Sequence, residues 1–151
     1  MADSAPTLTE KRALITGAAR GIGARTAEAL VREGATVAVH ARRMDQLDAV
    51  SDSVRALGGE PVRVAGDLTD GGAVAAFCRQ AIDTLGGIDI VINNAGVAAH
   101  GRVVDLQEEE WDQVMDVNLK APFLVTHHTL PTMLDQGTGL SLIHISEPTR
   151  P

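Results

Sequence analysis

A glycine-rich turn between an apolar run and a helix-like run is the strongest constraint on how this chain can fold. The turn, residues 16–23, reads Thr-Gly-Ala-Ala-Arg-Gly-Ile-Gly and follows the apolar residues 13–15 directly. Gly17 supplies the backbone freedom that a sharp reversal after a strand requires. Gly21 and Gly23 let the backbone approach a pyrophosphate and let the following helix pack close to the strand. The first N–H groups of that helix and its dipole then face an anion, so the turn predicts dinucleotide binding. A purely structural turn is the alternative, because the spacing is Gly-x-x-x-Gly-x-Gly and not the commoner Gly-x-Gly-x-x-Gly.

Strand-like and helix-like patterns alternate along the chain, which predicts βαβ units and a doubly wound parallel sheet of the Rossmann type in an α/β fold. The predicted strands cover residues 12–16, 36–40, 61–65, 88–93 and 140–145. The predicted helices cover residues 22–33, 44–57, 70–85 and 108–134, the last interrupted by Pro122 and Pro131. No linker or repeat divides the chain, so we expect residues 1–151 to form a single dinucleotide-binding domain.

The composition limits which binding partners and which cellular compartment we expect for this chain. Aromatic residues make up 2% of the chain, so the core must be built from aliphatic side chains, as in a parallel sheet covered by helices. The net charge of −7 argues against nucleic acid and against an anionic membrane surface as partners. Cys78 is the only cysteine, which predicts a reducing, cytoplasmic location and a small core residue. No apolar run approaches the length of a membrane span.

The end of the second strand indicates which dinucleotide is bound. Ligands of doubly wound sheets lie beyond the carboxyl ends of the strands, and an acid after the second strand would bind a ribose 2′-hydroxyl. Ala41 stands at that place, followed by Arg42, and Arg20 lies in the glycine turn on the same side. Two guanidinium groups suit a phosphate, so the pattern predicts NADP(H) in preference to NAD(H). Two ordinary solvated arginines are the alternative.

Two further strand ends carry candidate binding residues. Asp67 follows the third strand, where its carboxylate could accept a hydrogen bond from an adenine amino group or simply start the next helix. Residues 93–96 read Asn-Asn-Ala-Gly after the fourth strand. Their amides can tie neighbouring strand ends together, and their small residues leave room for a ribose and nicotinamide; a plain turn is the alternative.

The chain resembles the short-chain dehydrogenase/reductase family over roughly residues 9–139. The resemblance rests on Thr16-Gly17-x-x-x-Gly21-x-Gly23, Asp67, Asn93-Asn94-Ala95-Gly96, and the run from Trp111 through Asn118 to Phe123. It implies that the cofactor is held by Gly17, Arg20, Gly21, Ile22, Gly23, Arg42, Asp67, Leu68, Asn93, Asn94, Ala95 and Gly96. It also implies that Asn118 is the catalytic asparagine, which holds a water in a proton relay. From the residues alone, Asn118 is an unfavourable polar residue in a helix, at a kink before Pro122.

The catalytic residues that the family needs next are missing from this sequence. Family members use a tyrosine as the general acid or base, a lysine four residues later and a serine that binds the substrate oxygen, but this chain contains no tyrosine. Ser146 falls about where the serine belongs, although a slip of one residue would move that position to Glu147. We therefore expect a sheet that is incomplete on its C-terminal side. Residues 140–151 do not continue the family pattern, and we hypothesise that they are a non-native tail.

Two functions remain open at this point. The first is an oxidoreductase that transfers a hydride between NADP(H) and a small carbonyl or secondary alcohol, with a 3-oxoacyl-thioester reductase as the first named candidate. The resemblance implies that the parent protein is a homodimer or homotetramer, and we expect the chain as written to be inactive alone. The second is a non-catalytic NADP(H)-binding or sensing module. No metal site is predicted, because the adjacent His127 and His128 would point about 100° apart on a helix.

Overall fold

The five strands form one parallel sheet in the order β3-β2-β1-β4-β5. The computed structural model describes residues 7–143. Every predicted strand has a counterpart: the first, third and fourth are shorter at one end than predicted, and the second is longer. Residues 144–145 of the last predicted strand lie outside the described residues. The strands are β1 (Arg12–Ile15), β2 (Thr36–Ala41), β3 (Val62–Ala65), β4 (Ile90–Asn93) and β5 (Leu140–Ile143). The order reverses between β1 and β4, which is the switch point where doubly wound sheets bind their ligands.

The helices agree with the predicted ones in place but not in detail. They are α1 (Gly21–Arg32), η1 (Met44–Leu47), α2 (Asp48–Ala56), α3 (Gly71–Leu85), η2 (Val103–Asp105), α4 (Glu108–Met115), η3 (Asp116–Lys120) and α5 (Ala121–Gln136). The single helix expected over residues 44–57 begins as the 3-10 turn η1. The long helix expected over residues 108–134 is divided at η3, a π-helical turn, and neither proline divides it. Pro122 lies in the first turn of α5, directly after η3, and the helix continues through it.

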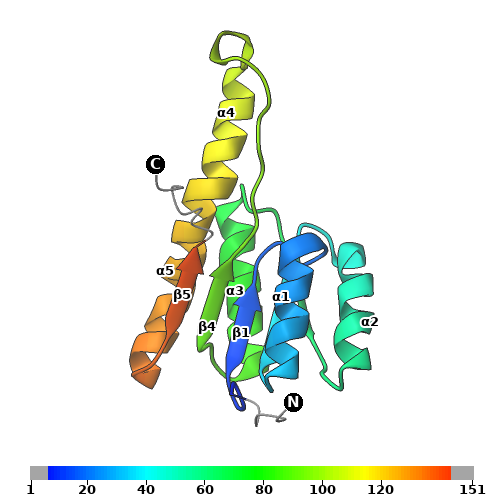
Figure 1. The fold of residues 1–151 in the computed structure, drawn as a ribbon. Helices are drawn as coiled ribbons and strands as arrows, with labels where there is room; N and C mark the ends of the chain where they lie inside the picture. The colour runs from blue at the N-terminus through cyan, green and yellow to red at the C-terminus, as the bar shows by residue number, and fades with distance from the viewer. Residues whose placement is uncertain (1–6, 144–151) are drawn as a thin grey trace, which may run out of the picture.

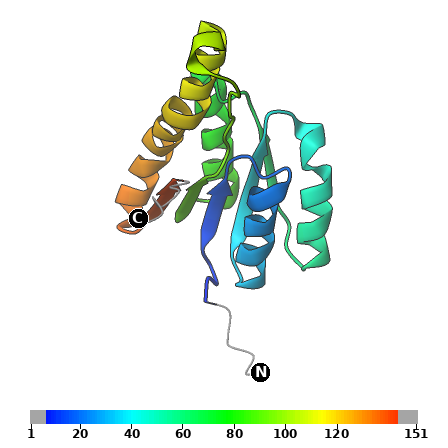
Figure 2. The same cartoon turned by 45° about the horizontal axis from the view of Figure 1, so that its top comes forward.

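Alternate strand residues face opposite layers of helices, as the pleat of a strand dictates. Leu14, Val64 and Val91 pack in the cluster that contains α3 and α5. Ile15 and Val39 pack in the cluster that contains α1 and α2. Figures 1 and 2 show α1 and α3 on opposite faces of the sheet, and Figure 1 shows α4 rising beyond the carboxyl ends of the strands. Both faces of the central strand β1 are therefore buried.

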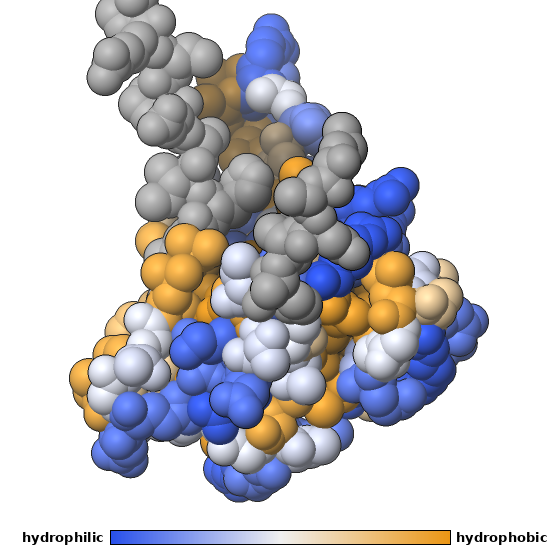
Figure 3. All heavy atoms as spheres, turned by 60° about the horizontal axis from the view of Figure 1, so that its bottom comes forward, coloured by the Kyte–Doolittle hydropathy of each residue, from blue (hydrophilic) through white to orange (hydrophobic). Residues whose placement is uncertain are grey.

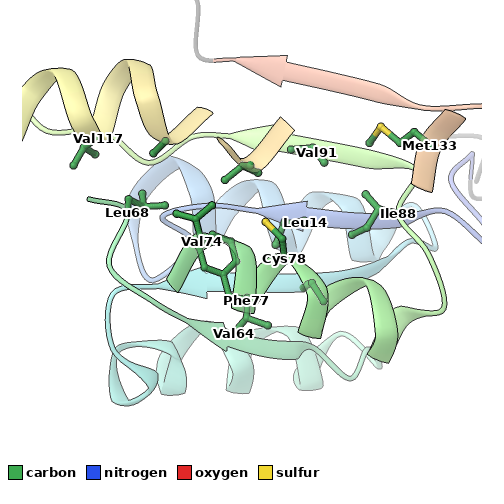
Figure 4. Close-up of a cluster of buried hydrophobic side chains, with 14 residues drawn as sticks. Leu14, Val64, Leu68, Val74, Phe77, Cys78, Ile88, Val91, Val117 and Met133 are labelled. Carbon is green, nitrogen blue, oxygen red and sulfur yellow. The ribbon is translucent and has the colours of Figure 1, made fainter. Parts of the chain in front are cut away.

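The larger cluster contains no aromatic residue except Phe77. Figure 4 shows Phe77 and Cys78, both on α3, pointing toward the sheet among Leu14, Val64 and Val74. Cys78 is fully buried, and this burial raises the pKa of its thiol to about 12. The prediction that Cys78 is a core residue is confirmed.

A polar clamp closes the amino ends of β1 and β4. The Arg12 guanidinium donates to both carboxylate oxygens of Asp89, at 2.7 and 3.2 Å, and to Oε1 of Gln136 at 3.0 Å. The Gln136 amide in turn donates to the carbonyl of Ile88 at 2.8 Å. Hydrogen bonding by Arg12 holds the pKa of the Asp89 carboxyl below its usual value. Figure 3 turns this end of the sheet toward the viewer and shows hydrophobic and hydrophilic patches side by side on the surface.

Candidate functional site

A cleft of about 1080 Å³ opens at the carboxyl ends of β1, β2, β3 and β4. It is where the sequence predicts the ligand to lie. Ten of the predicted binding residues line it: Gly17, Arg20, Gly21, Ile22, Arg42, Asp67, Leu68, Asn94, Ala95 and Gly96. Gly23 is buried beneath the glycine turn, and Asn93 is buried next to a smaller internal void. Ser146 lies outside the described residues.

The glycine turn leaves the first turn of α1 open toward the cleft. Gly17 and Gly21 adopt φ angles of +65° and +61°, in the left-handed region that favours glycine. The residue before the helix, Arg20, makes no capping hydrogen bond through its side chain. The N–H groups that begin α1 are therefore available to an anionic ligand.

The glycine turn and the Asn-Asn-Ala-Gly motif are locked together. The Thr16 hydroxyl accepts hydrogen bonds from the backbone N–H groups of Asn94 and Ala95, both at 3.1 Å. The Asn94 amide donates to the carbonyls of Thr16 and Gly17, at 3.0 and 3.1 Å. Asn94 thus ties two strand ends together, as the sequence indicates. Asn93 makes no such tie, because its buried Nδ2 has no hydrogen-bond partner within residues 7–143.

Two cations in the lining of the cleft form no ion pair within residues 7–143. Arg20 and Arg42 are both exposed, and neither forms an ion pair with another described residue. The neighbouring Arg43 is different, because it pairs with Asp45 at 2.9 Å. Ala41, at the end of β2, is 4% exposed and leaves no acid at this place. The end of β2, with Arg42 and without an acid, therefore suits an anion.

Asp67 lies in the cleft and takes part in a local turn. Its Oδ1 accepts hydrogen bonds from the backbone N–H and the hydroxyl of Thr69, at 2.9 and 2.8 Å. These bonds, with a smaller contribution from the charge of Arg42, hold the pKa of the carboxyl below its usual value. The start of α3 is capped by Asp70, whose Oδ1 accepts from Gly72 N at 2.8 Å. Asp67 is therefore anionic in the cleft and is not the helix cap.

Asn118 lies in η3, where the division between α4 and α5 turns its side chain toward the loop after β4. Its Oδ1 accepts from the backbone N–H of Val97 at 2.9 Å, and its Nδ2 donates to the carbonyl of Val97 at 2.7 Å. Both bonds go to the residue that directly follows the Asn-Asn-Ala-Gly motif. Where the sequence predicts a kink, the structure has the π-helical turn Asp116–Lys120. Asn118 is not among the residues that line the cleft, but its partner Val97 is.

Several residues that line the cleft were not predicted from the sequence, among them two on α4 and one on β2. Glu109 and Gln113 line it from α4, although Glu109 reads only as part of an acidic helix start. His40 forms its inner wall from β2 and is 2% exposed. In the sequence, His40 stands out only because it is a polar residue within the apolar run of residues 37–41.

The remaining predictions concern metal and membrane. Within residues 7–143, no three His, Cys, Asp or Glu side chains come together in a way that could hold a metal ion. The rings of His127 and His128 meet edge to face, with their centroids 5.0 Å apart. Of the helices in the described part of the chain, none has the length and apolar character needed to cross a membrane.

Comparison with known proteins gives the chain its family. The profile of the short chain dehydrogenase family matches residues 11–147. An oxidoreductase of Staphylococcus aureus with no characterized function is 40% identical over 140 residues, which cover 92% of this chain and 59% of that protein. The 3-oxoacyl-[acyl-carrier-protein] reductase of Staphylococcus epidermidis is 36% identical over 130 residues, covering 85% of this chain and 53% of the relative.

A solved structure agrees with these relatives. The crystal structure of a metagenomic short-chain oxidoreductase in complex with NADP is 38% identical, with a TM-score of 0.85 over 89% of this chain and 61% of that one. The chain thus spans little more than half the length of the relatives that it matches. With the sheet order, the cleft and the profile in agreement, the chain belongs to the short-chain dehydrogenase family of oxidoreductases.

Proposed function

We propose that this chain is the NADP(H)-binding part of an oxidoreductase that transfers a hydride between NADP(H) and a carbonyl or secondary alcohol. The observation that carries the proposal is the cationic side of the cleft, where Arg20 and Arg42 are unpaired among the described residues and Ala41 replaces an acid. A carboxylate at Ala41 would repel a 2′-phosphate, whereas guanidinium groups bind it by charge and by paired hydrogen bonds.

The shape of the glycine turn fits a dinucleotide. A Cβ atom at Gly23 would lie 2.5 Å from the carbonyl oxygen of Gly17 and 2.6 Å from Nδ2 of Asn94, so only glycine permits this close packing under the loop. Around Gly21 there is nothing within 4 Å of an added Cβ, which leaves open space where a pyrophosphate would approach. Together with the uncapped start of α1, this arrangement is a cradle for phosphate.

Different residues of the cleft would contact different parts of the cofactor. The glycine turn would hold the pyrophosphate, and Arg20 and Arg42 would hold the 2′-phosphate. Asp67 and Leu68 would contact the adenine, and residues 93–96 would line the ribose and nicotinamide. When bound, the nicotinamide supplies or accepts the hydride. Asn118 would hold the loop after β4 in place at the nicotinamide end of the cleft, through its two hydrogen bonds to Val97.

The chain as written lacks a general acid for this chemistry. The family's tyrosine has no counterpart in a sequence without tyrosine, and the only lysines are Lys11 and Lys120. We therefore expect purified chain to show no carbonyl-dependent NADPH oxidation above an Asn118→Lys control. For the whole protein, reduction of a 3-oxoacyl thioester is the first activity to assay, since one relative is a reductase of that class.

Calorimetric titration of the chain with NADPH and NADH tests the cofactor assignment. We expect tighter binding of NADPH, and an Arg42→Ala variant that weakens NADPH binding roughly tenfold to a hundredfold, the effect of losing a charge-assisted contact, with NADH unchanged. Arg43→Ala is the matched control, because Arg43 is adjacent and already paired with Asp45. Tighter NADH binding, or an equal loss in the two variants, would overturn the assignment.

A non-catalytic NADP(H)-binding module is the second candidate. It is favoured by the lining of the cleft, whose ten predicted binding residues come together within residues 17–96 without any tyrosine. Reading the source gene beyond the codon for Pro151 separates the candidates. A Tyr-x-x-x-Lys sequence about a dozen residues after Ser146 supports the enzyme, and a stop codon supports the binding module.

An apolar stripe on α5 supports a homodimer or homotetramer. Phe123, His127, Leu130 and Leu134 share one face of the helix, and the Phe123 and His127 rings stack at 5.9 Å. Phe123 and Leu134 are 65% and 70% exposed. Light scattering after size exclusion is expected to show an oligomer that Leu134→Lys converts to monomer. An unchanged mass in that variant would contradict the proposal.

A further inference from the structure

His40 joins the two loops that flank the inner end of the cleft. Its Nδ1 accepts a hydrogen bond from the backbone N–H of Gly17 at 3.4 Å, and its Nε2 lies 3.0 Å from the carbonyl oxygen of Gly66. Gly17 begins the glycine turn after β1, and Gly66 precedes Asp67 after β3. The ring itself packs on Phe77, with centroids 4.2 Å apart.

The two partners define the protonation of the ring. A backbone N–H can only donate, so Nδ1 must be the bare nitrogen that accepts from Gly17. A neutral imidazole carries one proton, which then belongs to Nε2 and is donated to the carbonyl of Gly66. Burial of the ring favours this neutral state and lowers the pKa of His40 to about 4. Both ring nitrogens are thus satisfied only in this one tautomer.

Backbone hydrogen bonds anchor each of the two loops to β2. The N–H of Ala18 donates to the carbonyl of His40 at 2.8 Å, and the N–H of Gly66 donates to the carbonyl of Ala41 at 3.1 Å. Each bond ties one loop to β2, but neither crosses from one loop to the other. The His40 side chain adds a direct link, because its ring contacts the backbone of both loops.

We propose that His40 is a positioning residue of the cleft, whose ring holds the glycine turn and the Gly66–Leu68 loop at the spacing that a dinucleotide needs. The inference rests on the proposed function and adds a residue to it. His40 does not read the 2′-phosphate, since its ring lies on the inner wall and is 2% exposed. Loss of the ring should therefore weaken the binding of NADPH and of NADH equally, because the two share the adenine and the pyrophosphate.

Three variants at His40 separate its two hydrogen bonds. In His40→Asn, the side-chain oxygen can replace Nδ1 as acceptor for Gly17, but nothing donates to Gly66. In His40→Gln, the amide nitrogen can replace Nε2 as donor to Gly66, but nothing accepts from Gly17. His40→Phe keeps the ring and its contact with Phe77 and removes both bonds. The chain is titrated calorimetrically with NADPH and with NADH at neutral pH, and its folded fraction is checked by circular dichroism.

We expect His40→Phe to bind both nucleotides at least tenfold more weakly, about 1.4 kcal/mol, with the other two variants in between. The equal loss for both nucleotides distinguishes His40 from Arg42, whose removal should affect NADPH alone. Amide exchange at Gly17 should accelerate in His40→Gln and not in His40→Asn, which a general loss of stability would not produce.

The outcomes separate this inference from the proposed function. Wild-type chain that binds neither nucleotide would overturn both. Wild-type chain that binds NADPH, with folded His40→Phe within twofold of it, would overturn the role of His40 and leave the proposed function standing. If His40→Phe does not fold, the two amide variants decide, and binding within twofold of wild type in both would reject the inference.

Discussion

Mild acid should destabilise this chain through His40 before its carboxylates respond. Burial lowers the pKa of His40 from 6.5 to about 4 in the folded chain. Between these values His40 binds a proton in the unfolded chain but not in the folded chain. The free energy of unfolding therefore falls as the pH drops through this range. Each pH unit within it is worth up to about 1.4 kcal/mol, which gives a loss of about 2 kcal/mol between pH 7.5 and pH 5.

The charged groups near the ring do not cancel this effect. Asp67 lies on the loop that the ring contacts, and its charge raises the pKa of His40, but by less than desolvation lowers it. Hydrogen bonds hold the pKa values of Asp67 and Asp89 below their usual range. The stability that these carboxylates contribute is therefore present above the pKa of an unfolded Asp, about 3.9, and is lost as the pH falls through their lower folded values. Measurements kept between pH 5 and pH 7.5 therefore report on histidine.

Urea unfolding followed by circular dichroism at several pH values gives the free energy of unfolding directly. His40→Asn is the control, since it retains an acceptor for Gly17 and cannot titrate. We expect the wild-type chain to lose about 2 kcal/mol more than this variant over the range. Parallel pH profiles for the two chains would refute the reasoning, because they would show that the buried ring is not the group that resists protonation.

Two further substitutions test the clamp and the glycine turn. Asp89→Asn leaves the Arg12 charge half-buried without its partner, and the free energy of unfolding in urea should fall by about 2 kcal/mol. Arg43→Ala removes an exposed pair and should leave the urea midpoint unchanged; a similar shift in both variants would contradict the role of the clamp. Gly17→Ala should lower stability by at least about 3 kcal/mol in thermal melts, because it adds a clash to the cost of a positive φ. Gly137→Ala has a similar φ of +72° but open space around it, so it should cost about 1 kcal/mol, and equal losses would show that crowding at Gly17 is unimportant.

The sheet and most of the cleft could be predicted because they depend on local patterns. Runs of β-branched and aliphatic residues mark β1, β2 and β4, and the residues that follow each parallel strand must meet at one edge of the sheet. The glycine spacing likewise identifies the start of α1. These features require no knowledge of how distant segments pack.

The rest of the site depends on contacts that no local pattern records. The sequence indicates an irregularity at Asn118, but no residue type marks its π-helical form, and Pro122 stands in the first turn of the helix that follows. Gln113 reaches the cleft only because of how α4 is placed over the strand ends. His40 owes its role to partners 23 and 26 residues away, on two other strands' loops.

The close fit between the glycine turn and the Asn-Asn-Ala-Gly motif has a consequence for protein engineering. A Cβ at Gly17 would lie 2.8 Å from Cα of Ala95, and one at Gly23 would lie 2.6 Å from Nδ2 of Asn94. The hydrogen bonds between the two motifs join residues 77 to 79 positions apart in the sequence, yet the motifs fit together as one unit. Neither could be transplanted alone into another parallel sheet: a grafted glycine turn would need the host's neighbouring strand to end in the same asparagine and the same small residue.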